Sequence, residues 1–175
     1  MKSLPIVLLA LELAGSGSAS PATPLVESPM VHMMQFLSGR LTADGKFQDY
    51  SSGTTRGLHI DIQGAKYSDG FELSEDEFFS DGEEQRKVWT FNKAVDGNYI
   101  GHRSDLIGVA RIREFDDTVE LTYTARVQAK SGVYNLNFDD RFVFENASTL
   151  TNSVSVSLLM IPVGKAALTI HRAGP

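Results

Sequence analysis

The sequence contains no cysteine, and this absence excludes several kinds of site. Without a thiol, the chain forms no disulfide, no cysteine nucleophile, no cysteine-ligated zinc site and no iron–sulfur cluster. The sequence also lacks a phosphate-binding glycine loop and a Gly-x-Ser-x-Gly nucleophile motif. Four histidines are present, but they are widely separated and show no spacing typical of metal ligands. They are His32, His59, His102 and His171. We therefore expect neither a metal nor another cofactor.

Basic residues are scarce relative to acidic ones. Sixteen Lys and Arg residues face twenty-two Asp and Glu residues, which gives a formal charge of -6. Nucleic-acid-binding proteins usually present a basic face, and anionic membranes attract clusters of basic residues. The charge balance therefore argues against nucleic acid as a partner and against electrostatic docking on an anionic membrane. With 42% hydrophobic residues in 175, the chain has the size and composition of one packed domain.

A long apolar run occurs once, close to the N-terminus. Met1-Lys2 precedes a mostly apolar stretch from Leu4 to Leu13, and small residues follow up to Ser20. A basic start, about ten apolar residues and a small-residue end are typical of a secretory signal peptide. We therefore expect residues 1–20 to send the protein to the periplasm or outside the cell. The alternative is a buried N-terminal helix, because so short a run fits both.

The residues that follow this run bear on membrane attachment. Leu13-Ala14-Gly15 resembles the start of a bacterial lipoprotein cleavage site, in which the next residue is a lipid-bearing cysteine. Ser16 stands at that position, so we expect no stable lipid anchor. Residues 21–29 contain three prolines among small residues, and we place a linker at residues 21–35.

From Leu37 onward, apolar and polar residues alternate with the period of a β-strand. Turn signals recur between the alternating segments, and Asp81-Gly82 and Asp96-Gly97 are typical of tight hairpins. The pattern predicts an all-β domain over residues 36–172. We expect an up-and-down antiparallel, lipocalin-like β-barrel of about nine or ten strands. A β-sandwich is the alternative, because the sequence does not show whether the sheet closes.

The positions of the turns predict which residues face one another across the hairpins. Turns at residues 116–117, 131–132 and 146–148 would place Ala110, Tyr123, Asp140 and Asn152 in one row on the inner, apolar face, beside Phe138. Burying a polar group without a partner costs about 1–3 kcal/mol. One explanation is a self-contained network, from the Tyr123 hydroxyl to Asp140 and from Asp140 to the Asn152 amide. The other is a polar anchor for a ligand, or an acid–base pair with a raised pKa at Asp140.

A second polar group is predicted around Asp81-Gly82. A two-residue turn there places Glu77 opposite Arg86 and directs Glu75, Glu77 and Arg86 inward. The simpler interpretation of such residues is a set of cross-strand ion pairs near the barrel rim. The same interpretation applies to Asp49 and Arg56, which we expect to pair across the turn at residues 52–53.

The register around Asp81-Gly82 also places two aromatic residues. Trp89 and Phe91 fall on the face opposite Arg86. We therefore expect them on the outer surface of the barrel or against the N-terminal segment.

Short motifs spread along residues 36–172 carry a family resemblance. They are Phe36-x-x-Gly39, Gly45-x-Phe47-x-Asp49, Leu73-x-Glu75, Asp81-Gly82, Arg86-x-x-Trp89, Asp105-x-x-Gly108-x-Ala110, Phe138-Asp139-Asp140, Asn152 and Val163-Gly164. This set resembles the bacterial envelope domain-of-unknown-function family 3833. The resemblance implies a small lipocalin-like barrel, often made as a lipoprotein, with no established activity. The chain departs from the family pattern at Glu77, where an aromatic residue is expected, and at Arg141, where tryptophan is usual.

Three functions follow from these expectations. The first is binding of an apolar small molecule or lipid inside the barrel, through Tyr123, Asp140, Asn152, Glu75, Glu77, Arg86 and Phe138. The second is a cofactor-independent isomerase or cyclase acting on an apolar substrate, in which Asp140 is the acid or base and Tyr123 the hydrogen-bond donor. The third is a structural envelope protein whose barrel is filled by its own side chains.

Overall fold

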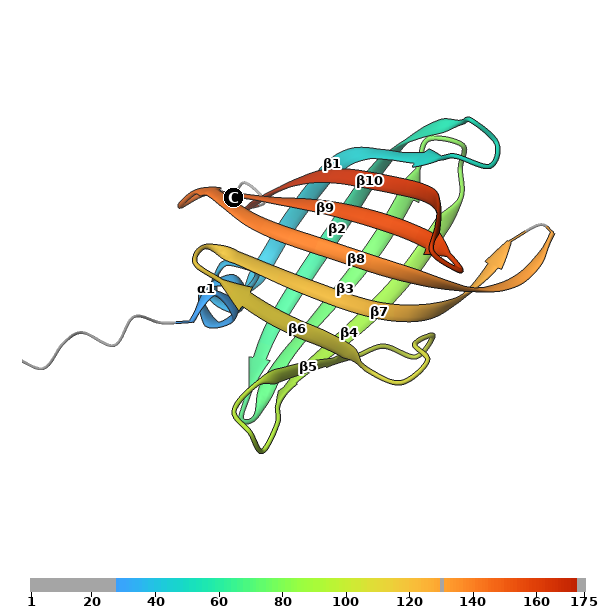
Figure 1. The fold of residues 1–175 in the computed structure, drawn as a ribbon. Coiled ribbons are helices and arrows are strands. Elements are labelled where there is room, and N and C mark those ends of the chain that lie inside the picture. Colours follow the sequence, from blue (N-terminus) through green and yellow to red (C-terminus); the bar gives the residue numbers. More distant parts are fainter. Residues whose placement is uncertain (1–27, 130, 173–175) are drawn as a thin grey trace, which may run out of the picture.

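The described residues form one closed barrel of antiparallel strands with a short helix at one end (Figure 1). The structure, a computed structural model, describes residues 28–129 and 131–172. Its elements are α1 (Pro29–Phe36), β1 (Gly39–Asp49), β2 (Thr55–Tyr67), β3 (Gly70–Phe79), β4 (Glu84–Lys93), β5 (Tyr99–His102), β6 (Ala110–Phe115), β7 (Thr118–Ala129), β8 (Gly132–Asn146), β9 (Thr149–Leu158) and β10 (Ile161–Arg172). Each strand pairs with its neighbours in sequence, and β1 pairs with β10 to close the ring. The predicted up-and-down barrel is confirmed, and the alternative of a sandwich is wrong.

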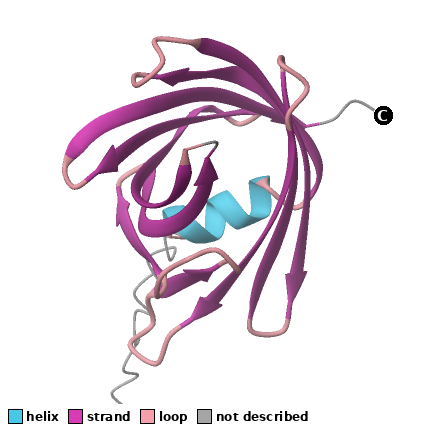
Figure 2. Cartoon of the chain, turned by 90° about the vertical axis from the view of Figure 1, so that its right-hand side faces the viewer, coloured by secondary structure: helices cyan, strands magenta, loops and turns pink. Residues whose placement is uncertain are grey.

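Helix α1 overlaps residues 21–35, the segment that we expected to be a linker, and ends at Phe36. Ser28 precedes the helix, and its side-chain oxygen accepts a hydrogen bond from the Val31 amide, while Pro29 occupies the first turn. The amide of Met30 donates to Glu114 of β6 at 2.9 Å. Figure 2, a view along the barrel from the opposite end, shows α1 lying across the far end of the ring of strands. The predicted signal segment lies outside the described residues.

The end of α1 approaches β2 closely enough to require a glycine. A Cβ atom on Gly64 would lie 1.9 Å from the Leu37 carbonyl oxygen, which no side chain tolerates. Met30, Met33 and Phe36 of the helix are buried in the same apolar core as the barrel wall. Helix α1 therefore covers this end of the barrel. Among the described residues, no helix is long and apolar enough to cross a membrane.

Two hairpins have a register that differs from the expected one by two residues. In β7 and β8, Ala129 pairs with Gly132, so Tyr123 lies opposite Phe138 and not opposite Asp140. Between β8 and β9, a β-bulge close to the turn shifts the pairing, and Asp140 lies opposite Val154. The expected single row is therefore wrong. A shift of two residues preserves the face, so the same side chains still point inward.

The β3–β4 hairpin has a register that differs by one residue. The Phe79 amide donates to the Glu83 carbonyl at 2.9 Å, which leaves three residues in the connection, and Gly82 has a φ of 87°. This is the geometry of a three-residue hairpin loop whose last residue is a left-handed glycine. An odd number of loop residues reverses the facing of β4, so the prediction that Arg86 points inward is wrong.

The same one-residue difference brings two aromatic side chains into the barrel. Trp89 and Phe91 are 4% and 2% exposed and lie in the core. They stack on each other with ring centroids 5.6 Å apart. The expectation that they lie on the outer surface is therefore also wrong.

Candidate ligand-binding site in the barrel interior

Polar side chains from opposite parts of the barrel meet in its interior. Glu75 and Glu77 come from β3, Lys87 from β4, Arg103 from the segment after β5, Tyr123 from β7, Asp140 from β8 and Asn152 from β9. Of the site residues predicted from the sequence, Arg86 is the one that faces solvent, where it pairs with Asp76 at 2.9 Å. The others face the interior, and Phe138 is partly buried against the core.

Tyr123, Asp140 and Asn152 form a diagonal across three strands. Phe142 and not Asp140 lies opposite Asn152, so Asn152 is displaced toward α1, while Tyr123 is displaced toward the other end. The Tyr123 hydroxyl donates to Asp140 Oδ2 at 3.2 Å. Its ring stacks on Phe138 with centroids 5.0 Å apart. The diagonal therefore keeps one of the two hydrogen bonds of the expected network.

The second hydrogen bond of that network is missing. Asp140 Oδ1 and Asn152 Nδ2 are buried and have no hydrogen-bond partner among the described residues. Both side chains are less than one-tenth exposed. The interior thus contains an unpaired carboxyl oxygen and an unpaired amide donor on neighbouring strands, within a largely apolar wall.

Arg103 places a positive charge against two interior aromatic residues, Trp89 and Tyr123. Its side chain is 5% exposed and makes a bidentate pair with Asp105, through Nε at 2.6 Å and the terminal nitrogen at 3.0 Å. The guanidinium carbon lies 4.4 Å from the centre of the Trp89 ring and 5.1 Å from that of Tyr123. Cation–π contact and a fork-shaped carboxylate pair are the two interactions that arginine makes best. Sequence reasoning missed Arg103 because it lies in a segment without strand periodicity.

Lys87 and Glu77 form the second interior ion pair. Lys87 Nζ lies 2.7 Å and 2.8 Å from the two Glu77 carboxylate oxygens. The Glu77 side chain is 7% exposed and that of Lys87 is 27% exposed. The sequence would have indicated Lys87 had the three-residue loop between β3 and β4 been recognised, because the loop turns residue 87 and not residue 86 inward.

Glu75 and Asp140 are two interior carboxyls that form no ion pair among the described residues. Desolvation raises the pKa of Glu75 to about 7, and repulsion from Glu77 adds to it, against the attraction of Lys87 and Arg103. Desolvation likewise raises the pKa of Asp140 to about 7, although the hydrogen bond from Tyr123 works in the opposite direction. Part of the Glu75 surface remains accessible, yet the side chain points into a closed barrel, so the surrounding wall sets its pKa. Near neutral pH, both groups are therefore partly protonated.

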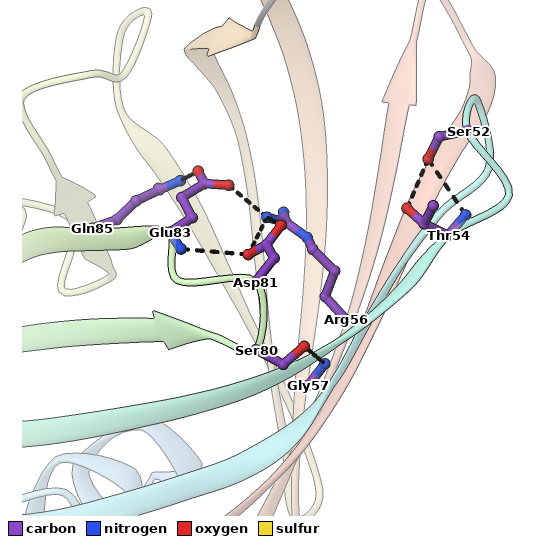
Figure 3. Close-up of polar contacts among 8 residues, drawn as sticks. All are labelled: Ser52, Thr54, Arg56, Gly57, Ser80, Asp81, Glu83 and Gln85. Atoms are coloured by element: carbon purple, nitrogen blue, oxygen red, sulfur yellow. Dashed lines mark hydrogen bonds and ion pairs between the residues drawn. The ribbon is translucent and has the colours of Figure 1, made fainter.

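Arg56 occupies the rim of the barrel opposite α1, at the inner face of β2 (Figure 3). Its guanidinium lies 4.1 Å from the Phe79 ring centre and pairs with Asp81 at 3.1 Å and with Glu83. The predicted pairing of Arg56 with Asp49 is wrong. Asp49 accepts hydrogen bonds within its own turn instead, at 2.8 Å from the Ser51 amide. Arg56 therefore links the β1–β2 and β3–β4 hairpins at this rim.

No group of three or more His, Asp and Glu side chains in the described residues has the arrangement of a metal site. The interior acids are distributed over β3 and β8 and face the cations Lys87 and Arg103. Their arrangement favours hydrogen bonding and proton exchange.

The family described as "Protein of unknown function (DUF3833)" matches residues 10–172. The chain belongs to the DUF3833 family. The resemblance that the sequence motifs indicated is thereby confirmed. No curated protein matches this DUF3833 chain.

Two solved structures share the barrel of this DUF3833 protein. The S-type phycobiliprotein lyase CPES from Guillardia theta is 11% identical, with a TM-score of 0.62 over 85% of this chain and 94% of its own. Rv2717c from M. tuberculosis is 15% identical, with a TM-score of 0.53 over 85% of this chain and 100% of its own. At such low identity, the likeness establishes the fold of the DUF3833 protein.

Proposed function

We propose that this DUF3833 protein binds an apolar small molecule, such as a lipid, inside the barrel and holds its polar end at Asp140 and Asn152. The observation that carries the proposal is the pair of unpaired atoms, Asp140 Oδ1 and Asn152 Nδ2. Leaving a buried polar atom without a partner costs about 1–3 kcal/mol. A ligand group between these two atoms would remove that cost, whereas the protein alone does not.

The wall around these atoms suits an apolar ligand. Phe138, Phe142 and Ile112 point inward yet are only partly buried, so some of their apolar surface is open toward the interior or its rim. Phe138 is also next to Tyr123, whose ring it stacks on. Barrels of about eight or more strands enclose one small ligand when their own side chains do not fill them.

The unpaired atoms define the polar end of the ligand. Asn152 Nδ2 donates a hydrogen bond, and Asp140 Oδ1 accepts one when ionised and donates one when protonated. With the pKa of Asp140 at about 7, both forms are present at neutral pH. A hydroxyl or a carboxylic acid both donates and accepts, and therefore satisfies both residues.

Native mass spectrometry of protein purified without detergent tests the proposal. The wild type should carry an apolar molecule that organic solvent extracts and that denaturation releases. Asn152→Leu and Asp140→Leu keep the volume and the apolar character of the wall but remove the polar anchor, and should lose the bound molecule. Asp139 lies on the same strand as Asp140 but faces solvent, so the Asp139→Leu variant should keep the bound molecule.

A different result would contradict ligand binding in the barrel. Wild-type protein that is repeatedly free of bound molecules, and that no lipid extract stabilises against heat, contradicts ligand binding. That outcome would favour the structural alternative, in which Tyr123, Phe138 and their neighbours fill the barrel.

The pKa values near 7 favour one second candidate, a cofactor-independent isomerase or cyclase. A general acid or base works best when its pKa is close to the working pH, which holds for Asp140 and Glu75. In such a reaction the substrate gives a proton to one carboxylate and regains one at another atom, so its mass does not change. Chromatography of the extracted molecule before and after incubation with enzyme detects isomers. Turnover that Asp140→Asn leaves unchanged would remove Asp140 from the mechanism.

We also propose that the protein acts in the periplasm or outside the cell. The support is the sequence of residues 1–20, with its basic start and apolar run. N-terminal sequencing of the protein recovered from bacterial cell fractions tests this. An intact Met1 on cytoplasmic protein would contradict export.

A further inference from the structure

Exposed apolar side chains gather at the rim opposite α1. Three connections on one side of this rim carry six of them: β5–β6 with Ile107 and Val109, β7–β8 with the adjacent Val133, and β9–β10 with Leu159, Met160 and Ile161. We call these six residues the apolar rim. Tyr50 of the β1–β2 connection is exposed beside them, and its amide donates to the Val163 carbonyl at 2.9 Å. Leu159, Met160 and Ile161 are 81%, 91% and 67% exposed, and they follow one another at a single hairpin tip. The β7–β8 and β9–β10 hairpins end on the right in Figure 1, away from α1.

The three connections are neighbours around the barrel. Strands β5 to β10 follow one another in the ring, so their connections occupy one continuous side of the rim. The β5–β6 connection is also tied to β7, because the Ile107 amide donates to the Thr124 carbonyl at 2.8 Å. The apolar rim is therefore held in place by the sheet.

The β9–β10 tip keeps its apolar residues in an unfavourable backbone conformation. Leu159 and Met160 form the two-residue connection and have φ values of 48° and 68°. Hairpin turns with positive φ at both positions strongly prefer Asn-Gly, because other side chains are strained there. Two large, exposed apolar residues at these positions do not stabilise the fold. They do suit a tip that enters an apolar environment.

Charge is distributed unevenly around the same rim. On the apolar side, Arg126 of β7 and Lys165 of β10 are exposed and take part in no ion pair among the described residues. Two carboxylates lie on that side: Asp105, which Arg103 neutralises, and the exposed Asp139 of β8, which is level with Lys165 across Ser155. Acidic residues occupy the other side of the rim, on the β1–β2 and β3–β4 hairpins; they are Asp49, Asp81, Glu83 and Glu84. The apolar side is thus complementary to an anionic surface, although the whole chain is acidic.

We propose that the apolar rim inserts into the surface of an anionic lipid bilayer and docks this end of the barrel on the membrane. Small apolar tips on separate loops, flanked by cations, match the way proteins bind to the membrane interface. Docking is independent of what the interior binds.

The absence of cysteine allows a direct test at a single site. A polarity-sensitive dye is attached through Met160→Cys in the otherwise unchanged full chain, and through Val95→Cys as the control, because Val95 is exposed in the β4–β5 connection at the α1 end. Vesicles of phosphatidylcholine mixed with phosphatidylglycerol should raise the emission and shift it to the blue for the dye at position 160. The dye at position 95 should remain in water. An unchanged signal at position 160 in protein that floats with the vesicles overturns the proposal, whatever else in the chain binds lipid.

Two further variants test the contribution of each feature. Leu159→Asn with Met160→Gly retains the turn and removes the apolar tip, and should weaken vesicle binding at least roughly tenfold, because two large side chains no longer leave water. Arg126→Gln with Lys165→Gln should reduce the preference for phosphatidylglycerol over pure phosphatidylcholine. Wild-type protein that does not bind vesicles, or that dimerises through the tip in sedimentation experiments, would show that the apolar rim does not serve membrane docking.

Discussion

Asp140 and Asn152 hold polar atoms inside the barrel that have no partner within residues 28–129 and 131–172, and this is unfavourable for the folded state. A barrel adapted for stability alone would have apolar side chains at both positions. Residues that lower stability without an evident structural gain are characteristic of functional sites, where activity and stability compete. The effect of these two residues on the free energy of unfolding can be measured in the ligand-free protein.

Asn152→Leu should stabilise the ligand-free protein by about 1 kcal/mol or more, because it removes an unpaired amide and buries an apolar side chain of similar volume. Urea unfolding followed by Trp89 fluorescence measures the change. Asn135→Leu, on the outward face of β8, should stay within about 0.5 kcal/mol of the wild type. If Asn152→Leu lowers the free energy of unfolding instead, the amide has a partner and belongs to a structural network.

The raised pKa values of Glu75 and Asp140 predict how stability depends on pH. Both carboxyls keep their proton in the folded protein up to about pH 7, whereas in the unfolded chain they lose it near pH 4.5 and pH 3.8. At these two groups the folded state therefore binds more protons in this interval, so their contribution to stability falls as the pH rises. We expect a loss of at least about 2 kcal/mol between pH 4.5 and pH 7, since one pKa unit corresponds to about 1.4 kcal/mol.

The Asp140→Asn variant tests whether Asp140 contributes to this pH dependence of stability. The amide does not ionise, so the variant should show a shallower fall in stability than the wild type over the same pH interval. Asp139→Asn, one residue away and exposed, should leave the profile unchanged. Stability that is constant or rises from pH 4.5 to pH 7 would show that the interior is hydrated enough to hold both carboxylates ionised.

Lys87 and Arg86 form a matched pair of neighbouring cations on opposite faces of β4. Lys87→Met should destabilise the protein by about 3 kcal/mol, because it leaves the buried Glu77 carboxylate without its partner. Arg86→Met removes an exposed pair with Asp76 and should cost less than about 1 kcal/mol. Thermal unfolding of both variants measures the difference. Equal effects would contradict the facing of β4.

Among the elements, the β9–β10 hairpin contains a turn that is poor for folding. Leu159→Asn with Met160→Gly replaces two strained residues by the pair that this turn favours. We expect the variant to be more stable by about 1–2 kcal/mol, which chemical denaturation measures. A loss of stability would mean that Leu159 and Met160 pack against the barrel. The gain in stability does not depend on whether the tip meets a membrane.

The hairpins also show how far sequence reasoning extends at this scale. Strand periodicity identified the barrel and the inward face of β7, β8 and β9, because a register error of two residues does not change the face. The β3–β4 hairpin could not be placed in the same way. Asp81-Gly82 fits both a two-residue turn and a three-residue loop with a final glycine, and the two place opposite faces of β4 inward.

At the scale of the whole molecule, Tyr123, Asp140, Asn152, Glu75 and Glu77 were predicted to face the interior because they lie on regular strands. Arg103 and helix α1 were missed because neither lies in a segment with strand periodicity. The first lies in an irregular segment, and the second begins at a proline in a stretch whose composition is typical of a linker. The net charge was also an incomplete guide, since it conceals the separation of cations and acids around the rim.

We propose above that the barrel interior holds an apolar ligand through Asp140 and Asn152. Trp89 is the single tryptophan of the chain and lies in the interior, so its emission reports on a ligand there. The most direct measurement is a titration with cis-parinaric acid, an apolar polyene with a carboxylic acid end, followed by energy transfer from Trp89. We expect saturable transfer in the wild type and in Asp139→Leu, and a loss of affinity of at least about tenfold in Asn152→Leu, which corresponds to about 1.4 kcal/mol. Transfer that is absent in the wild type, or equally strong in Asn152→Leu, would contradict it.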